Sequence, residues 1–156
     1  MGLKEEKILK VSAIKNGTVI DHIPSNCLFK VISLLNLDKV EKPITFGTNL
    51  DSRKLGSKAI IKISDMFFED SDINKIALIA PEVKLSIIKN YEVVEKKVVK
   101  VPDEILGLAT CFNPHCISNH ESIETRFSVQ VENGIISLKC KYCEKITDQE
   151  RIVLLK

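Results

Sequence analysis

Four of the five cysteines stand in two close pairs in the last third of the 156-residue chain. Cys111 and Cys116 are separated by four residues, Cys140 and Cys143 by two, and 23 residues lie between the pairs. Two short loops that each carry two thiols can direct four sulfurs at one tetrahedral ion, as in structural zinc sites. The spacing therefore predicts one structural Zn²⁺ per chain. Four thiolates leave no coordination position for water, so we expect the metal to support the fold and not to catalyse.

The same cysteines have two alternative uses. Two disulfides would need an oxidising compartment, whereas no signal peptide is apparent and Cys27 leaves an odd count, which favours a reducing, cytoplasmic setting. A redox pair at Cys140 and Cys143 would lack the βαβ setting of such sites and would leave the first cysteine pair unexplained. Zinc is the stronger interpretation. Cys27 is expected to be a small buried or half-buried side chain.

The sequence around the cysteines predicts a small all-β domain. Residues 125–131 and 135–140 both alternate apolar and polar side chains, and Glu132-Asn133-Gly134 between them is a turn signal. A hairpin between two cysteine pairs is typical of a zinc ribbon. About 50 residues bury too little surface to be stable unaided, so the metal must contribute to folding. We expect this zinc-ribbon-like domain to span residues 104–156, after a linker at Val101-Pro102-Asp103.

Residues 1–103 are predicted to form an α+β domain. Their pattern of short β-rich runs, turn residues and helix caps follows the order ββ, α, ββ, α, β(β), which favours a ferredoxin-like fold with one mostly antiparallel sheet and two helices on one face. The expected elements are strands 7–14 and 18–23 joined at Asn16-Gly17, a helix capped by Ser25 with Leu28, Val31, Ile32 and Leu35 on one face, strands 43–50 and 58–64, a helix capped by Ser71-Asp72 and stopped by Pro81, and strands 83–88 and 91–99.

Composition and motifs argue against several classes of function. The chain is 44% hydrophobic and 28% charged, and it has no apolar run long enough to cross a membrane. Residues 1–103 carry 17 Lys and Arg against 14 Asp and Glu, but residues 104–156 carry 6 against 7. A DNA-binding zinc ribbon should present a basic face, so DNA is not an expected partner. Phosphate-loop, dinucleotide and serine-hydrolase motifs are absent, so we do not expect an enzyme.

Three separated blocks of the sequence resemble the regulatory chain of aspartate carbamoyltransferase. They run from Gly17 to Pro24, from Asn90 to Val94 and from Cys140 to Glu144, in the family's order, and the cysteine spacing is also the family's. The resemblance covers essentially the whole chain. It implies a non-catalytic regulatory subunit of pyrimidine biosynthesis, with an allosteric nucleotide-binding domain at residues 1–103 and a zinc domain at 104–156 that docks on the catalytic chain. It also implies a regulatory dimer formed through the first domain, with CTP and ATP as effectors and UTP as a further candidate.

The resemblance also implies which residues bind the nucleotide, whose phosphates need several cations. Lys62 and Lys96 match the family's phosphate- and ribose-contacting lysines, and Lys58 matches another basic position. Ser86 stands where the family's best-known member has an asparagine near the base and ribose. The rest of the implied site lines the opening hairpin or contacts the base: Ala13, Ile14, Val19, Asp21, His22, Tyr91 and Val93. Taken singly, such lysines are more often solvated surface, and such a tyrosine is more often sheet packing.

In the zinc domain, the resemblance implies docking on the catalytic chain through Asn113, Lys141, Tyr142 and Glu144. His115 replaces the family's second asparagine in the first cysteine loop. Taken alone, Asn113 could be a turn residue and the charges could be solvated. Two rival functions remain for the chain as a whole: a stand-alone nucleotide- or RNA-binding zinc-ribbon protein, which would act without a partner, and a zinc-ribbon transcription factor, which the acidic balance of residues 104–156 disfavours.

Overall fold

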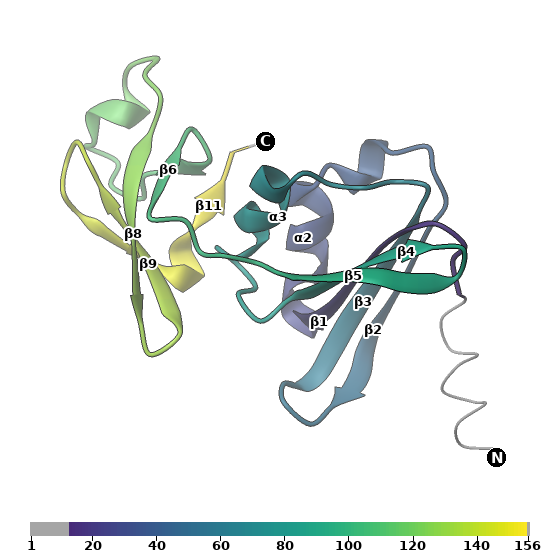
Figure 1. The fold of residues 1–156 in the computed structure, drawn as a ribbon. Helices are drawn as coiled ribbons and strands as arrows, with labels where there is room; N and C mark the ends of the chain where they lie inside the picture. The colour runs from purple at the N-terminus through teal and green to yellow at the C-terminus, as the bar shows by residue number, and fades with distance from the viewer. Residues whose placement is uncertain (1–12, 156) are drawn as a thin grey trace. The chain divides into compact units, whose positions relative to one another are not determined.

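A computed structural model describes residues 13–155 of the chain (Figure 1). The chain divides into two compact units, Met1–Val99 (unit 1) and Lys100–Lys156 (unit 2). Each unit has its own set of buried apolar side chains. None of the helices formed by residues 13–155 is long and apolar enough to cross a membrane.

Unit 1 is built on a five-stranded antiparallel sheet with the order β2-β3-β1-β4-β5. Helices follow the first and third strands. Counting only α-helices and strands, the first six elements therefore run βαββαβ, with the strand order β2-β3-β1-β4. This is the ferredoxin-like arrangement, which confirms the expected fold class. The elements are β1 (Gly17–Pro24), η1 (Ser25–Cys27), α2 (Leu28–Leu34), η2 (Leu37–Lys39), β2 (Ile44–Ser52), β3 (Gly56–Ser64), α3 (Asp70–Ile76), β4 (Lys84–Lys89) and β5 (Glu92–Val98).

One face of this sheet packs against α2 and α3, which lie side by side (Figure 1). Alternate strand residues such as Ile20, Ile61 and Leu85 are fully or almost fully buried there. The helices contribute the buried side chains of Leu28, Val31, Ile73 and Ile76. Each fully buried residue of this kind stabilises the fold by about 1.5–3 kcal/mol. The residues between them point to the other face, which neither helix covers and which we call the open face.

The expected hairpin across Asn16-Gly17 is wrong. β1 is the central strand of the sheet, paired with β3 along one edge and with β4 along the other, so neither edge is left for a further strand. Of the expected first strand, residues 7–12 lie outside the described residues and 13–14 form no strand. Gly17 instead brings the chain into β1 at φ +143°, where any side chain would collide with the Ile63 carbonyl.

Both helices begin away from their expected caps. Ser25–Cys27 forms the short turn η1, so α2 begins only at Leu28. The second helix, α3, begins at Asp70, before the expected Ser71-Asp72 cap, and ends at Ile76, before Pro81. Neither helix has a side-chain capping hydrogen bond. Helices of seven residues are held mainly by packing of their apolar face, so cap signals fixed their ends poorly.

The expected strands 43–50 and 58–64 are present as the β2–β3 hairpin, and 83–88 and 91–99 as β4 and β5. The turn between β4 and β5 contains Asn90 and Tyr91, both with positive φ (53° and 66°), as in the turns that suit the twist of a two-residue hairpin. Val99 lies just beyond β5.

Unit 2 contains a four-stranded antiparallel sheet, β10-β9-β8-β6, and a two-stranded sheet, β11-β7. Its hairpin β8–β9 turns at Asn133 and Gly134, both with positive φ, which confirms the zinc-ribbon-like hairpin. Phe127, Ile136 and Leu138 are its fully buried large side chains. The elements are β6 (Glu104–Leu106), β7 (Ala109–Thr110), η3 (Ile117–Asn119), β8 (Arg126–Glu132), β9 (Ile135–Cys140), β10 (Ile146–Asp148), η4 (Gln149–Arg151) and β11 (Val153–Leu154).

Candidate functional site

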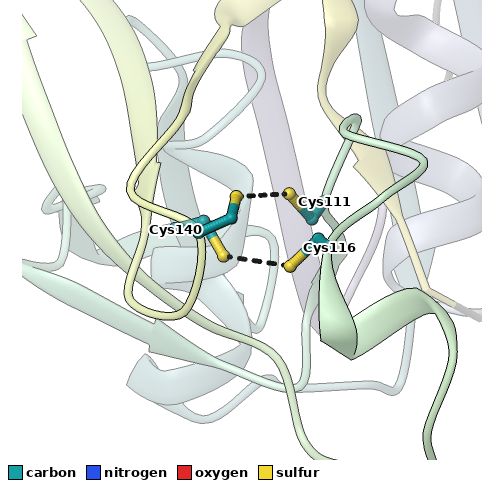
Figure 2. Close-up of side chains that lie close together, drawn as sticks. Cys111, Cys116 and Cys140 are labelled. Atoms are coloured by element: carbon teal, nitrogen blue, oxygen red, sulfur yellow. Dashed lines mark hydrogen bonds between the residues drawn. The ribbon is translucent and has the colours of Figure 1, made fainter.

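The four paired cysteines converge on one point in unit 2. Cys111 directly follows β7 and Cys116 directly precedes η3, whereas Cys140 ends β9 and Cys143 lies in the turn before β10. All four Sγ atoms lie within 4.8 Å of one another. Cys111 Sγ is 3.6 Å from Cys143 Sγ. Cys116 Sγ is 3.7 Å from Cys140 Sγ, so each sulfur of the first loop faces a sulfur of the second (Figure 2).

These distances fit a tetrahedral Zn²⁺ ion. Zn–S bonds of about 2.3 Å place neighbouring sulfurs of a tetrahedron roughly 3.8 Å apart. All five cysteines are free thiols, and the fifth, Cys27, lies half-buried in unit 1, with its Sγ 3.6 Å from the carbonyl oxygen of Ile79. The donor set is therefore a closed structural zinc site, and the disulfide and redox alternatives are not supported.

The environment of the sulfurs sets their protonation before metal binds. Burial raises the pKa of Cys111 to about 12 and also raises the pKa of Cys140. Burial acts to raise the pKa of Cys143 too, but hydrogen bonds from the Lys145 backbone and the Asn113 side chain outweigh it and lower that pKa to about 7. At neutral pH a metal ion must therefore displace protons from at least two of these thiols.

Two residues just after the second ligand hold the metal loops, and the sequence analysis missed both. Asn119 Nδ2 donates to the carbonyl oxygens of Cys111 (2.9 Å) and Asn113 (2.7 Å), which fixes the first loop from within. Ser118 Oγ lies 3.1 Å from Cys116 Sγ, and towards a thiolate its hydroxyl can only donate. Ser and Asn commonly bond to nearby backbone, so their position beside Cys116 was the available signal.

The four expected docking residues all lie on the two metal loops. Asn113 accepts a hydrogen bond from the His115 N–H at its Oδ1 (3.1 Å), so its side chain already stabilises the first metal loop. Tyr142 donates its hydroxyl to the Glu124 carbonyl (2.8 Å) while 40% of the residue stays exposed. Lys141 and Glu144 are exposed. Two exposed apolar residues beside ligands were not anticipated: Phe112 and Ile117.

The open face of unit 1 brings together most of the expected nucleotide-binding residues. Val19 on β1 has Lys62 of β3 as its Cα partner on one side and Ser86 of β4 on the other. Ser86 in turn pairs with Lys96 of β5. Residues directly opposite one another share a face of the sheet, so Lys62, Val19, Ser86 and Lys96 form one row across four strands. Val19, Lys62 and Ser86 are half-buried and Lys96 is exposed.

A charged cluster lies on one side of this row, further along β1 and β3. Lys58 Nζ lies 3.0 Å from Asp21 Oδ1, and the His22 N–H donates to the same oxygen at 2.6 Å. His22 has φ 63° and occupies an irregularity in the β1–β3 pairing. Its buried Nδ1 makes no hydrogen bond among the described residues, and it lies 3.6 Å from Asp21 Oδ1. The cluster therefore holds a basic side chain and a histidine ring around one carboxylate beside the row.

On the opposite side of the row, along the strands, lie the β4–β5 turn and the chain before β1. The Tyr91 N–H donates to the Lys15 carbonyl (2.9 Å), which joins the turn to the segment containing Ala13 and Ile14. Val93 pairs with Ile88, whose other neighbour is Gly17 of β1. Tyr91 and Val93 are exposed by 67% and 50%, so both leave surface for a ligand. The expected residues thus form a central row on one face of the sheet and one group on each side of that row.

Lys62 is the row's most sheltered cation. Burial lowers the pKa of its ammonium group, and the charge of Asp21 partly opposes that effect. Desolvation of a cation is unfavourable unless a negative charge comes close. An anionic ligand on the open face would add to the negative charge that Asp21 provides.

Both units match family models. Residues 9–100 match the aspartate carbamoyltransferase regulatory chain, allosteric domain, and residues 103–153 match the metal binding domain of the same chain. Among curated relatives, aspartate carbamoyltransferase regulatory chains are 53% identical over 152 residues in Bacteroides thetaiotaomicron (97% of this chain, 99% of the relative) and 54% over 153 residues in Porphyromonas gingivalis (98% and 100%). The one from Thermococcus sibiricus is 47% identical over 147 residues (94% and 97%).

These matches describe a regulatory and not a catalytic subunit, which confirms the expectation that this chain is not the enzyme and makes a catalytic chain its partner. The metal binding domain and the four converging sulfurs agree on a structural zinc site. Since the family models span both units and the relatives cover nearly the full length, the chain belongs to the family of aspartate carbamoyltransferase regulatory chains.

Proposed function

We propose that the open face of unit 1 binds nucleoside triphosphate effectors, CTP and ATP, with UTP as a third candidate, and that binding alters the affinity of the catalytic chain for aspartate. The observation that carries this proposal is the row Lys62–Val19–Ser86–Lys96, with a charged cluster on one side of it along the strands and exposed Tyr91 on the other side. An apolar and hydroxyl-bearing middle between two cations suits a ribose with phosphates on one side of it.

The base would lie at the Tyr91 end and the phosphates towards Asp21, His22 and Lys58. An aromatic side chain and Val93 offer a surface for a base, whereas the cationic end neutralises phosphate charge. Ser86, in the middle, offers one hydroxyl as donor or acceptor. We therefore expect Ser86 to affect the choice between pyrimidine and purine more than overall affinity.

Unit 2 would dock on the catalytic chain through its two metal loops. Asn113, Lys141, Tyr142 and Glu144 are the expected contact residues. All four belong to segments that the cysteines fix, so the zinc ion would order the docking surface before the partner arrives and reduce the entropy cost of association. Metal and docking are therefore properties of the same unit.

A regulatory dimer through unit 1 has support at the outer edge of the sheet. β2 is an edge strand, and its Phe46 is 47% exposed. Phe29 of α2 is 69% exposed, and the two rings stack edge to face with centroids 6.3 Å apart. A strand edge that no other strand within residues 13–155 covers, beside exposed aromatic rings, is a site for pairing with a second copy. Sedimentation of Phe46→Ser should show a weakened dimer with zinc retained.

The assembly would act in the cytoplasm, without nucleic acid or membrane partners. An effector can shift the catalytic chain only by binding its two states unequally, typically by about 1–3 kcal/mol. The test combines isothermal titration of the isolated chain with CTP, ATP and UTP and aspartate saturation curves of the complex. Binding together with a shifted half-saturation supports the proposal. A chain that binds none of the three nucleotides, or binds them without changing the curve, would refute it.

A further inference from the structure

The open face carries a lysine that neither motif nor resemblance singled out. Lys84 is the first residue of β4 and is exposed. Leu85 and Ile87, which alternate with it, are buried against the helices, so Lys84 shares the open face with Ser86.

Lys84 lies at the charged end of the site. Its Cα partners are Asp21 on β1 and Val98 on β5. Lys96 is the diagonal neighbour across β4 and β5, because it pairs with Ser86 two residues along. Diagonal neighbours in an antiparallel pair are about 7–8 Å apart, within reach of two long side chains that meet one anion.

The acidic side chains nearby are already paired with other lysines. Asp21 pairs with Lys58 at 3.0 Å, and Glu82 pairs with Lys54 at 2.7 Å. Among residues 13–155, neither Lys84 nor Lys96 forms an ion pair. Two like charges this close repel each other unless an anion lies between them. This part of the open face therefore has an unmatched positive charge.

We infer that Lys84 binds the outer phosphates of the effector together with Lys96, an inference that rests on the function proposed above. Lys84 stands four positions before Ile88, which lies at the Tyr91 end, and at 3.3–3.4 Å per residue this is about 13 Å along β4. A base, ribose and phosphate chain laid along the strand would bring its last phosphates to Lys84. Lys84 thus selects for triphosphates over monophosphates.

The test is isothermal titration of the zinc-loaded full chain with CTP and with CMP. Lys84→Gln should weaken CTP binding about tenfold, the loss expected for one charged hydrogen-bond partner, and should weaken CMP binding much less. Lys84→Arg should retain CTP affinity. Lys97→Gln is the matched control, because Lys97 is on the neighbouring strand but faces the helices, where its Nζ pairs with Asp70 at 3.1 Å.

The outcomes distinguish failure of the role assigned to Lys84 from failure of the proposed effector site. If Lys96→Gln loses CTP while Lys84→Gln binds like the parent, the effector site stands and the role of Lys84 is refuted. Equal losses of CTP and CMP in Lys84→Gln would refute contact with the outer phosphates. A parent chain that binds no CTP would refute the proposed function, and the role of Lys84 with it. Hydrogen exchange of the β1–β5 sheet is measured in every variant to confirm that unit 1 is intact.

Discussion

The two units stabilise their sites in different ways. Among the described residues, nine of the twelve largest fully buried side chains lie in unit 1 and three in unit 2, a contrast that exceeds the difference in their lengths. Unit 1 has a conventional hydrophobic core, and its proposed nucleotide site lies on the side of the sheet away from that core. Unit 2 has a small core and places its site on the loops that the metal holds together. The comparison teaches that ligand binding should be separable from folding in unit 1 but not in unit 2.

Removing the metal should have the largest effect and should show the difference between the two units most clearly. Chelation, or Cys140→Ala, should unfold unit 2, because metal binding and folding of small zinc domains share a free energy of about 10 kcal/mol or more. Unit 1 should remain folded and bind CTP. Hydrogen exchange resolved by segment measures both, with Cys27→Ala as the control that removes a thiol outside the cluster. Continued protection of β8 and β9 in metal-free protein would contradict the prediction.

Acidification should weaken zinc binding and so destabilise unit 2 more than unit 1, because the thiols must be deprotonated to bind the metal. Burial raises the pKa of Cys111 to about 12 and raises that of Cys140, so both thiols are protonated near pH 7 and must lose their protons to bind zinc. Loss of at least two protons makes zinc affinity fall at least about 100-fold for each pH unit of acidification, or about 2.7 kcal/mol. Taken alone, the raised pKa values act in the opposite direction on any folded metal-free unit 2, which would lose stability as the pH rises from about 9 towards 12. Zinc titrations in buffers of different ionisation enthalpy count the protons released.

The nucleotide site should be affected by changes that leave both folds intact. Lys96→Ala should weaken CTP binding by about 1–3 kcal/mol, since it removes a charged hydrogen-bond partner of a phosphate. Zinc content and thermal unfolding should not change. Lys97→Ala, on the opposite face of the same strand, is the matched control. An unchanged CTP affinity in Lys96→Ala would place the phosphates elsewhere on unit 1.

Asn119 tests how far unit 2 depends on residues that do not touch the metal. Asn119→Asp keeps the shape of the side chain but removes the Nδ2 donor to the Cys111 and Asn113 carbonyls. Loss of such supporting bonds typically costs 10- to 100-fold in metal affinity, about 1.4–2.7 kcal/mol. Competition with a chromophoric chelator measures it, and the cobalt-substituted absorption spectrum reports ligand geometry. Parent-like zinc affinity would show that the backbone alone fixes the loop.

The smallest effect is expected at the rim of the docking surface. Glu144 is exposed, and its carboxylate makes no hydrogen bond or ion pair with the rest of residues 13–155, so Glu144→Gln should preserve zinc and CTP binding. It should weaken assembly with the catalytic chain by about 1 kcal/mol or less and change the salt dependence of association. Asn113→Ala is a poorer test, because that side chain also serves the His115 N–H. Salt-independent, parent-like assembly of Glu144→Gln would place the interface on another face.

The sequence predicted the features that depend on residue type and spacing. The cysteine pairs located the metal centre, and Asn133-Gly134 located the turn of its hairpin, because both signals are local. Asn16-Gly17 misled for the same reason: a turn dipeptide does not reveal that β1 will have partners on both edges. The resemblance supplied Lys62 and Lys96, but only the strand register shows that they lie on one row.

Lys84 and Asn119 illustrate what a single sequence withholds. Lys84 is one of 23 Lys and Arg, and its significance arises only when β1, β4 and β5 are aligned. Asn119 is an ordinary turn residue until the first metal loop folds back over it. In each case the decisive neighbours are distant in sequence or fixed by backbone geometry, which composition and periodicity do not encode.

The pairing of sulfurs from the two metal loops also determines when zinc can bind during synthesis of the chain. Each sulfur of the first loop faces one of the second, so Cys111 and Cys116 cannot complete a shell until Cys140 and Cys143 have been translated. Unit 1 precedes them, and domains generally fold in order as the chain emerges. A nascent chain would therefore be able to sense nucleotide before it could join an assembly. Zinc binds only after unit 1 has been synthesised, so the cellular zinc supply would determine what fraction of folded unit 1 domains is joined to a catalytic chain.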